Sequence, residues 1–139
     1  MFAKTSKYAL RLMVCVAKRP GDEPIRSSDL AKKSSVPPAY VSKVMRRLED
    51  AGLVGSRKGR GGGFWLARPP EEILLREVLS AVEEQAVASE DCVFGWGPCS
   101  QSSPCPLHET WKQLETEVGA WTRKTLADVV AEAGGPGED

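Results

Sequence analysis

The sequence predicts a mainly α-helical fold with a winged helix-turn-helix, a small β-hairpin wing and a long C-terminal helix. Three observations lead to this prediction. Apolar residues recur at helical spacing in the first half of the chain, a glycine- and arginine-rich strip follows them, and another helical pattern lies near the C-terminus. The length of 139 residues suits one domain with its own core.

The first predicted element is a helix over about residues 5–18. Its apolar side chains recur at helical spacing: Tyr8, Ala9, Leu12, Val16 and Ala17. The stretch does not resemble a signal peptide, because Lys7 and Arg11 interrupt it and no small-residue cleavage site follows. No apolar run in the chain approaches the roughly 20 residues that span a bilayer. We therefore expect a cytoplasmic protein with no membrane partner.

Residues 27–50 have the pattern of a helix-turn-helix. A short helix precedes a turn over residues 34–38, and a second helix begins at Pro38, where the missing N–H costs little. Gly52 is suited to end this helix in a left-handed conformation. The inward side of the second helix is apolar: Val41, Val44, Met45 and Leu48. Its outward side carries predicted DNA contacts: Tyr40, Ser42 and Lys43 for bases, and Arg46 and Arg47 for phosphates.

The strip that follows has the pattern of a β-hairpin wing. Short strands are predicted over residues 53–57 and 64–67, with a tip of glycines and cations between them. Because glycine lets the backbone approach another surface closely, we expect Arg57, Lys58 and Arg60 to reach DNA phosphates. Arg60 is the best candidate for the minor groove. A nucleotide-binding loop is the rival interpretation, but the strip has neither G-x-x-x-x-G-K-[ST] nor a strand–loop–helix frame.

Charge is divided unequally along the chain. Residues 1–68 carry 15 Lys and Arg against 5 Asp and Glu, whereas residues 69–139 carry 4 against 14. A basic half suggests a polyanionic partner, and double-stranded DNA is the one that fits a helix-turn-helix. We expect the acidic half to stay away from the DNA.

The second half begins with a short predicted helix over residues 75–83 and ends in a long helix from about Glu109 to Glu132. The long helix carries an apolar seam: Trp111, Leu114, Val118 and Trp121. A seam of this kind favours pairing with a second copy, and so a homodimer. The predicted organisation is a DNA-binding region over 1–70, a connecting helix over 71–87, a cysteine loop over 88–108, a dimerisation helix over 109–132 and a disordered tail over 133–139.

The stretch CVFGWGPCSQSSPCPLHETW holds three of the four cysteines and the only histidine. The ligand spacing is Cys92-x6-Cys99-x5-Cys105-x2-His108. Structural disulfides are disfavoured, because three cysteines leave one over and a cytoplasmic protein rarely forms them. Zinc accepts three cysteines and a histidine, but its knuckles usually have gaps of two to four residues. No base and orienting group accompany these thiols, so we expect no enzyme and no small-molecule substrate.

An iron–sulfur cluster fits the wide spacing best. The cluster is larger than a single ion, thiolates are its usual ligands, and histidine can replace a cysteine at one iron. A lone histidine at the start of a helix is often a plain surface residue, but the short gap from Cys105 favours His108 as a ligand. Carboxylates at Asp91 and Glu109 are alternative ligands. A zinc site remains the competing interpretation.

The chain resembles the Rrf-type winged-helix regulators, whose cluster-binding members include the IscR and NsrR types. The resemblance covers nearly the whole chain. It rests on TSKYALRLM, SSDLAKKSSVPPAYVSKVMRRLEDAGLV, the wing SRKGRGGGFWLAR, the helix REVLSAVEE and the three-cysteine loop. It implies a homodimeric repressor or activator with a cluster on Cys92, Cys99 and Cys105, for which we favour [2Fe–2S] over [4Fe–4S].

The resemblance also bears on the fourth ligand. IscR-like members use a histidine separated by two residues from the third cysteine, which matches His108. NsrR-like members use an acidic residue of the partner's first helix, and the corresponding residues 5–8 here hold no carboxylate. The first cysteine gap is six residues, whereas five is commoner in the family. Ser42-Lys43 stands where a Glu-Gln pair is common, so no operator sequence is carried over.

The function that these patterns predict is homodimeric, sequence-specific DNA binding, most simply as a repressor. An iron–sulfur cluster would control it in response to iron–sulfur status, redox state or nitric oxide. A protein of another class would share the composition: a zinc-binding or redox-carrier protein whose basic face binds an acidic protein. Colour and the salt dependence of DNA binding would distinguish the two.

Overall fold

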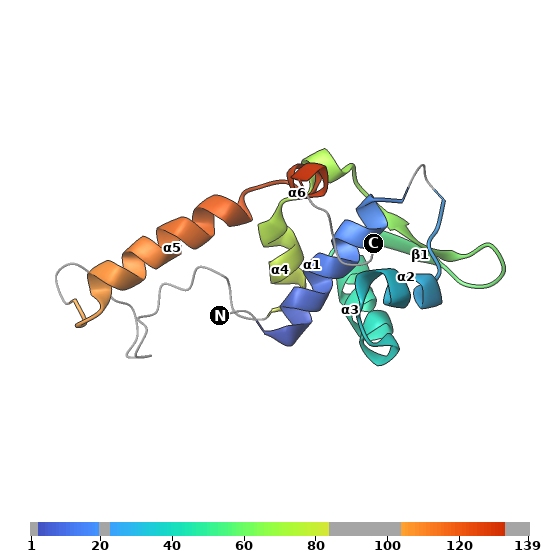
Figure 1. Cartoon of the computed structure of the whole chain (residues 1–139), viewed down its shortest axis with the longest axis horizontal. Coiled ribbons are helices and arrows are strands. Elements are labelled where there is room, and N and C mark those ends of the chain that lie inside the picture. The colour runs from blue at the N-terminus through green and yellow to red at the C-terminus, as the bar shows by residue number, and fades with distance from the viewer. Residues whose placement is uncertain (1–2, 20–22, 84–103, 133–139) are drawn as a thin grey trace.

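A computed structural model describes residues 3–19, 23–83 and 104–132. Over these residues the chain is mostly helical, with a two-stranded antiparallel hairpin (Figure 1). The elements in chain order are α1 (Lys4–Ala17), α2 (Ser27–Ser34), α3 (Pro38–Asp50), β1 (Val54–Arg57), β2 (Gly63–Leu66), the 3-10 turn η1 (Pro70–Glu72), α4 (Leu75–Val82), α5 (His108–Thr122) and α6 (Leu126–Glu132). The mainly α-helical, winged-helix prediction is confirmed. In this part of the chain, no helix combines the length and apolarity that crossing a membrane requires.

The helix-turn-helix is built on an apolar core shared by α1, α2 and α3. Val41, Val44, Met45 and Leu48 of α3 are fully buried, as their spacing predicts. They meet apolar residues of the other helices: Ala9, Leu12 and Met13 of α1, and Leu30 of α2. The residues of α3 outside this apolar face point to the wing, to solvent, or, for Tyr40 and Arg47, along the neighbouring helices α1 and α4.

Both ends of α3 are where the sequence predicts them. Pro38 occupies the first turn, and Gly52 has the left-handed φ of +79° just after the helix. The N–H of Gly52 donates to the Glu49 carbonyl at 2.9 Å, and the N–H of Leu53 donates to the Leu48 carbonyl at 3.0 Å. This pair of bonds satisfies the last carbonyls of the helix and turns the chain directly into β1.

The wing is a short hairpin in which Val54 pairs with Leu66 and Arg57 with Gly63. It is attached to the chain before α2 through a bridge between Ile25 and Phe64. The two residues exchange backbone hydrogen bonds of 2.9 Å in both directions. Ile25 therefore holds the wing against the N-terminal end of α2.

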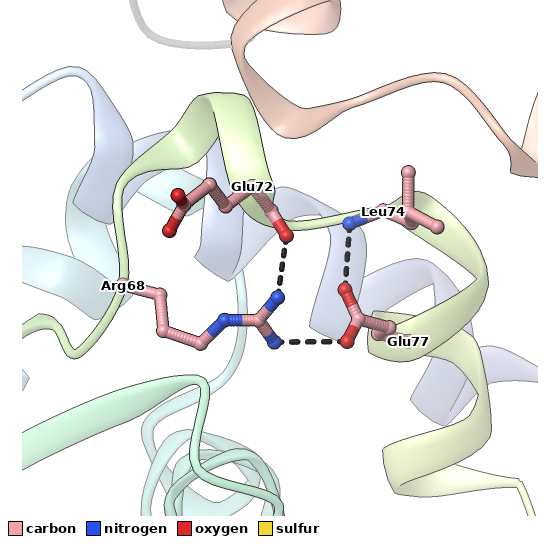
Figure 2. A network of polar contacts seen from close by, with 4 residues as sticks. All are labelled: Arg68, Glu72, Leu74 and Glu77. Atoms are coloured by element: carbon pink, nitrogen blue, oxygen red, sulfur yellow. Dashed lines mark hydrogen bonds and ion pairs between the residues drawn. The ribbon is translucent and has the colours of Figure 1, made fainter.

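The wing is tied to α4 by a polar network (Figure 2). Arg68 donates to the Glu77 carboxylate at 2.8 Å and also to the Glu72 carbonyl. Glu77 accepts the N–H of Leu74 at 2.9 Å, which caps the start of α4. The hydrogen bond from Arg68, followed by that from the Leu74 N–H, lowers the pKa of the Glu77 carboxyl.

The prediction of one long C-terminal helix over 109–132 is wrong, because the structure has two helices there. Residues 123–125 separate α5 from α6, and α6 turns back to pack on α1 and η1 (Figure 1). Thr125 and Asp128 form a reciprocal cap: each backbone N–H donates to the other's side chain at 3.1 Å. This cap starts a new helix and places Leu126 in the core, fully buried.

The connecting helix predicted over 71–87 forms part of the helical body. Val78 and Val82 of α4 are buried in the same core as α1 and α3. The structure describes only the last residues of the cysteine loop predicted over 88–108, and the predicted tail at 133–139 lies outside the described residues. The other predicted boundaries stay predictions.

Candidate nucleic-acid interface and cysteine segment

The wing, α3 and the start of α2 enclose a concave surface, and the cavity that it borders has a volume of about 820 Å³. Five cations line it: Arg26, Arg46, Arg57, Lys58 and Arg60. Ser27, Ser42 and Ser56 add hydroxyl groups. Guanidinium, ammonium and hydroxyl groups are the donors that proteins use toward phosphate oxygens. A polyanion that lies along this surface can therefore contact cations of α2, α3 and the wing together.

Two of these residues, Arg26 and Ser27, do not figure in the sequence prediction. Arg26 immediately precedes α2 and Ser27 is its first residue, so both lie at a helix N-terminus, where backbone N–H groups attract anions. The Ile25–Phe64 bridge brings them next to the wing. A cation directly before the first helix of a helix-turn-helix is the sequence signal that could have identified them.

Backbone contacts hold the wing in this position. A side chain at Gly63 would place its Cβ 2.4 Å from the Ile25 carbonyl oxygen, so only glycine allows this approach. The Arg57 guanidinium donates to the Gly61 carbonyl at 3.1 Å across the wing tip. Arg57 therefore shapes the tip as well as carrying charge toward the concave surface.

The concave surface is not purely basic, because Glu49 and Asp50 also line it. The Ser56 hydroxyl donates to the Glu49 carboxylate at 2.7 Å, which links α3 to the wing. A carboxylate engaged in this way fixes the spacing between the two elements. It also repels phosphate locally, so a bound anion is steered toward Arg46 and the wing tip.

The predicted contact residues of α3 divide between two flanks of the helix. Ser42 and Arg46 line the concave surface, and Lys43 is exposed beside them. Tyr40, 38% exposed, lies on the other flank and packs edge-on against Tyr8 of α1 at 5.2 Å between ring centroids. Arg47 lies on that flank too, and its guanidinium donates to the Val82 carbonyl of α4 at 3.0 Å. The structure thus does not bring Tyr40 and Arg47 together with the cations of the wing.

Helix α5 extends away from the body of the molecule, and it touches the body through α4 (Figure 1). The residues of its predicted seam are only partly covered. Trp111, Leu114 and Trp121 are half-buried, and Val118 is 8% exposed. The cover over this seam is much less complete than that over the apolar face of α3.

Two of the four predicted cluster ligands lie on one turn of chain. His108 is the first residue of α5 and is 5% exposed, and Cys105 just before it is half-buried. The backbone N–H of His108 donates to the Cys105 carbonyl at 3.1 Å, which closes this turn. Cys92 and Cys99 lie outside the described residues, as does Asp91, whereas Glu109 is exposed. The fourth cysteine, Cys15, packs against the core, and burial raises the pKa of its thiol.

The described part of the segment fits a soft metal centre. A thiol and an imidazole on one turn, in a partly enclosed place, are the donors that iron–sulfur clusters and zinc both accept. Over the residues that the structure describes, no group of three or more histidine, cysteine, aspartate or glutamate side chains comes together.

The family profile and two individual proteins that match this sequence are all described as transcriptional regulators. The family profile described as "Rrf2: Iron-dependent Transcriptional regulator" matches residues 2–132. The HTH-type transcriptional regulator IscR of Klebsiella pneumoniae is 32% identical over 125 residues, which cover 89% of this chain and 76% of the relative. The protein of the same name from Aliivibrio salmonicida is 30% identical over 115 residues, covering 83% of this chain and 67% of the relative.

Solved structures share the fold at lower identity. CymR of B. subtilis, described as its global cysteine regulator, superimposes with a TM-score of 0.80 at 21% identity, covering 96% of this chain and 98% of the other. IscR of T. potens superimposes with a TM-score of 0.72 at 21% identity, covering 95% and 87%. At this identity the likeness concerns the fold alone.

Proposed function

The chain belongs to the Rrf2 family of transcriptional regulators, and from that premise we propose that it is a homodimeric, sequence-specific DNA-binding regulator controlled by an iron–sulfur cluster. DNA-binding regulation is what the family and the relatives named IscR have in common, so the protein is not an enzyme. The observation that carries the DNA-binding part of the proposal is the cation-lined concave surface between α3 and the wing. Double-stranded DNA is its partner.

The proposed DNA contacts follow from the two elements that border this surface. The N-terminal half of α3 enters the major groove, where Ser42 and Lys43 reach base edges. Arg46, Arg57 and Lys58 hold phosphates, and Arg60 at the wing tip enters the adjacent minor groove. Arg26 and Ser27 add a phosphate contact from the start of α2.

The proposed homodimer forms through α5. Its half-buried apolar residues recur on one side of a helix that extends away from the body, which favours pairing with a second copy. Two paired bodies would present two α3 helices to half-sites about 34 Å apart, one turn of DNA. We further propose that the dimer represses the adjacent gene by occupying its promoter, and that the protein is cytoplasmic.

The proposed cofactor is held by Cys105 and His108 together with Cys92 and Cys99. The first two are described, and their position on one turn supports this ligand set. An iron–sulfur cluster supplies a centre that exchanges electrons, reacts with nitric oxide and depends on iron supply. We favour [2Fe–2S], because a histidine ligand is better known on that cluster than on [4Fe–4S]. Zinc on the same four residues is the competing assignment.

The DNA proposal is tested by the salt dependence of binding. Six to ten phosphate contacts should weaken binding by about 10³–10⁵ between 50 and 200 mM salt. Arg60→Gln should reduce the slope of log affinity against log salt by about one. Arg76→Gln is the matched control, because Arg76 is an exposed cation on α4 outside the concave surface. A slope equal in Arg60→Gln and wild type would contradict the assignment.

The cluster proposal is tested by absorption and Mössbauer spectra of protein purified without oxygen. We expect brown wild-type protein, an altered or lost cluster in His108→Ala, and an unchanged spectrum in Glu109→Gln. Because His108 is buried, His108→Cys serves as a second variant and should retain a cluster with a shifted spectrum. Colourless wild-type protein that iron and sulfide cannot reconstitute would instead support zinc or thiol chemistry.

A further inference from the structure

The two flanks of α3 have different neighbours. Ser42, Arg46 and Glu49 face the wing across the concave surface. On the opposite flank, Tyr40 and Arg47 are seven residues apart, two helical turns, and therefore lie on one side of the helix. Tyr40 packs on Tyr8 of α1, and Arg47 reaches α4. One flank thus faces the wing, whereas the exposed side chains of the other contact α1 and α4.

Arg47 contacts a backbone carbonyl group at the C-terminal end of α4. Val82 is the last residue of α4, and its carbonyl is one of the four that a helix cannot satisfy internally. The Arg47 guanidinium donates to this carbonyl at 3.0 Å. A cation at this end is also favoured by the helix dipole, whose negative pole lies there. Arg47 therefore caps α4 with a side chain that belongs to the recognition helix.

The end of α4 is a junction of three helices. The residue after Val82 is Glu83, whose carboxylate accepts the N–H of Ala3 at the start of α1, at 3.3 Å. α1, α3 and α4 are packed pairwise against one another. A shift of α3 therefore acts on the last residues of α4 and, through Glu83, on the start of α1.

We propose that Arg47 is a positioning residue that couples the recognition helix to the end of α4, rather than a phosphate contact. This inference rests on the proposed function, because it takes α3 as the helix that enters DNA. It replaces the sequence-based assignment of Arg47 to phosphate. Arg46, its neighbour in sequence on the wing-facing flank, keeps the phosphate role and supplies a matched control.

The first test separates a phosphate contact from a positioning role. The slope of log affinity against log salt is measured with a duplex selected by the wild-type protein from a random-sequence library. Arg46→Gln should lower the slope by about one, whereas Arg47→Gln should leave the slope unchanged. A slope lowered by about one in Arg47→Gln would overturn the inference while leaving the proposed function intact. Wild-type binding that does not respond to salt would overturn both.

The second test measures the coupling itself, by amide hydrogen exchange of residues 75–83 with and without the same duplex. Because coupling is reciprocal, DNA held on α3 should slow exchange in the last turn of α4 by about fivefold in wild type and in Arg46→Gln. In Arg47→Gln this protection should disappear. Arg47→Lys should retain it, because an ammonium group also donates to a carbonyl and suits a helix C-terminus.

A merely structural role for Arg47 predicts a different pattern. Arg47→Gln would then speed exchange equally with and without DNA, and wild type would show no protection of α4 on binding. The wild-type measurement decides this point even if Arg47→Gln folds poorly. Protection of α4 by DNA in wild type, lost in Arg47→Gln and kept in Arg47→Lys, is the expected result. Absence of that protection in wild type would overturn the inference.

Discussion

The apolar faces of α3 and α5 have similar sequence patterns but very different cover. In α3 the four apolar residues that face inward are fully buried by α1, α2 and α4. In α5 the corresponding residues are half-buried, apart from Val118, and the helix extends away from the body. The body of the winged helix therefore completes its core within one chain. Helix α5 leaves apolar surface that a second chain can cover.

The difference teaches what helical spacing can and cannot predict. Spacing of three and four residues identifies which side of a helix is apolar; the structure buries that side fully in α3 and only in part in α5. Spacing does not identify whether the covering surface comes from the same chain. That information lies in the number of neighbouring elements that fold onto the helix, which only the structure reveals.

The largest effect is expected from a charge placed on the α5 seam. Leu114→Asp should prevent dimer formation, because an unpaired carboxylate cannot be buried between two helices without a large cost. Losing the link between two DNA-binding bodies should reduce operator affinity by about 10²–10⁴. Sedimentation equilibrium and DNA titration measure the two effects. Gln113→Asp, on the exposed side of α5, is the control and should change neither.

Truncating a core residue of α3 should lower stability strongly and DNA binding less than the charge on α5 does. Met45→Ala removes most of a fully buried side chain and should destabilise the body by about 2–5 kcal/mol. Urea unfolding monitored by circular dichroism measures this loss. Leu114→Ala, which truncates a half-buried residue of α5, should cost less than about 2 kcal/mol at concentrations where the protein is monomeric. Equal losses would contradict the contrast between the two helices.

Replacing a glycine of the wing should change stability and DNA binding less than the substitutions in α5 and α3. Gly63→Ala places a Cβ against the Ile25 carbonyl and should displace the wing, costing more than about 1 kcal/mol. Gly59→Ala also has a positive φ, of +90°, but meets no atom within 4 Å. It serves as the matched control for backbone strain alone. If the contact with Ile25 positions the wing, Gly63→Ala should weaken DNA binding more than Gly59→Ala.

The smallest effect is expected from the network of Arg68 and Glu77. Because the folded-state pKa of Glu77 is below 4.5, its contribution to stability is fully present above pH 4.5 and is lost as the pH falls through the folded-state value. Glu77→Gln should therefore be destabilised at neutral pH by no more than about 1 kcal/mol, since the ion pair is partly exposed. The difference from wild type should shrink in urea titrations carried out progressively below pH 4.5. A constant difference would exclude this assignment.

Much of the fold could be predicted from local sequence signals. Pro38 and Gly52 mark the ends of α3, and the glycine-rich strip marks the wing, because backbone conformation restricts residue choice at these places. The break between α5 and α6 was missed, although T-x-x-D at 125–128 is a capping signature. The apolar pattern continues across the break, and an apolar pattern alone does not show that the chain has turned.

The candidate site could be predicted less completely. Basic residues beside a helix-turn-helix indicate DNA contact, which singles out the cations of the wing and Arg46, and the structure places these cations on one concave surface. Arg46 and Arg47 are adjacent cations that the sequence does not distinguish. Their separation onto different flanks follows from the 100° turn per residue together with the placement of α4. Arg26 was missed because the Ile25–Phe64 bridge brings it to the wing from a distant part of the sequence.

The most direct test of the account compares the operator affinity of one preparation before and after its cluster is removed without oxygen by a chelator. Titration with the selected duplex at constant salt gives both values. The account predicts that the two affinities differ by at least about fivefold, the lower end of typical couplings between sites. Equal affinities for the brown and the colourless protein would contradict control of DNA binding by an iron–sulfur cluster.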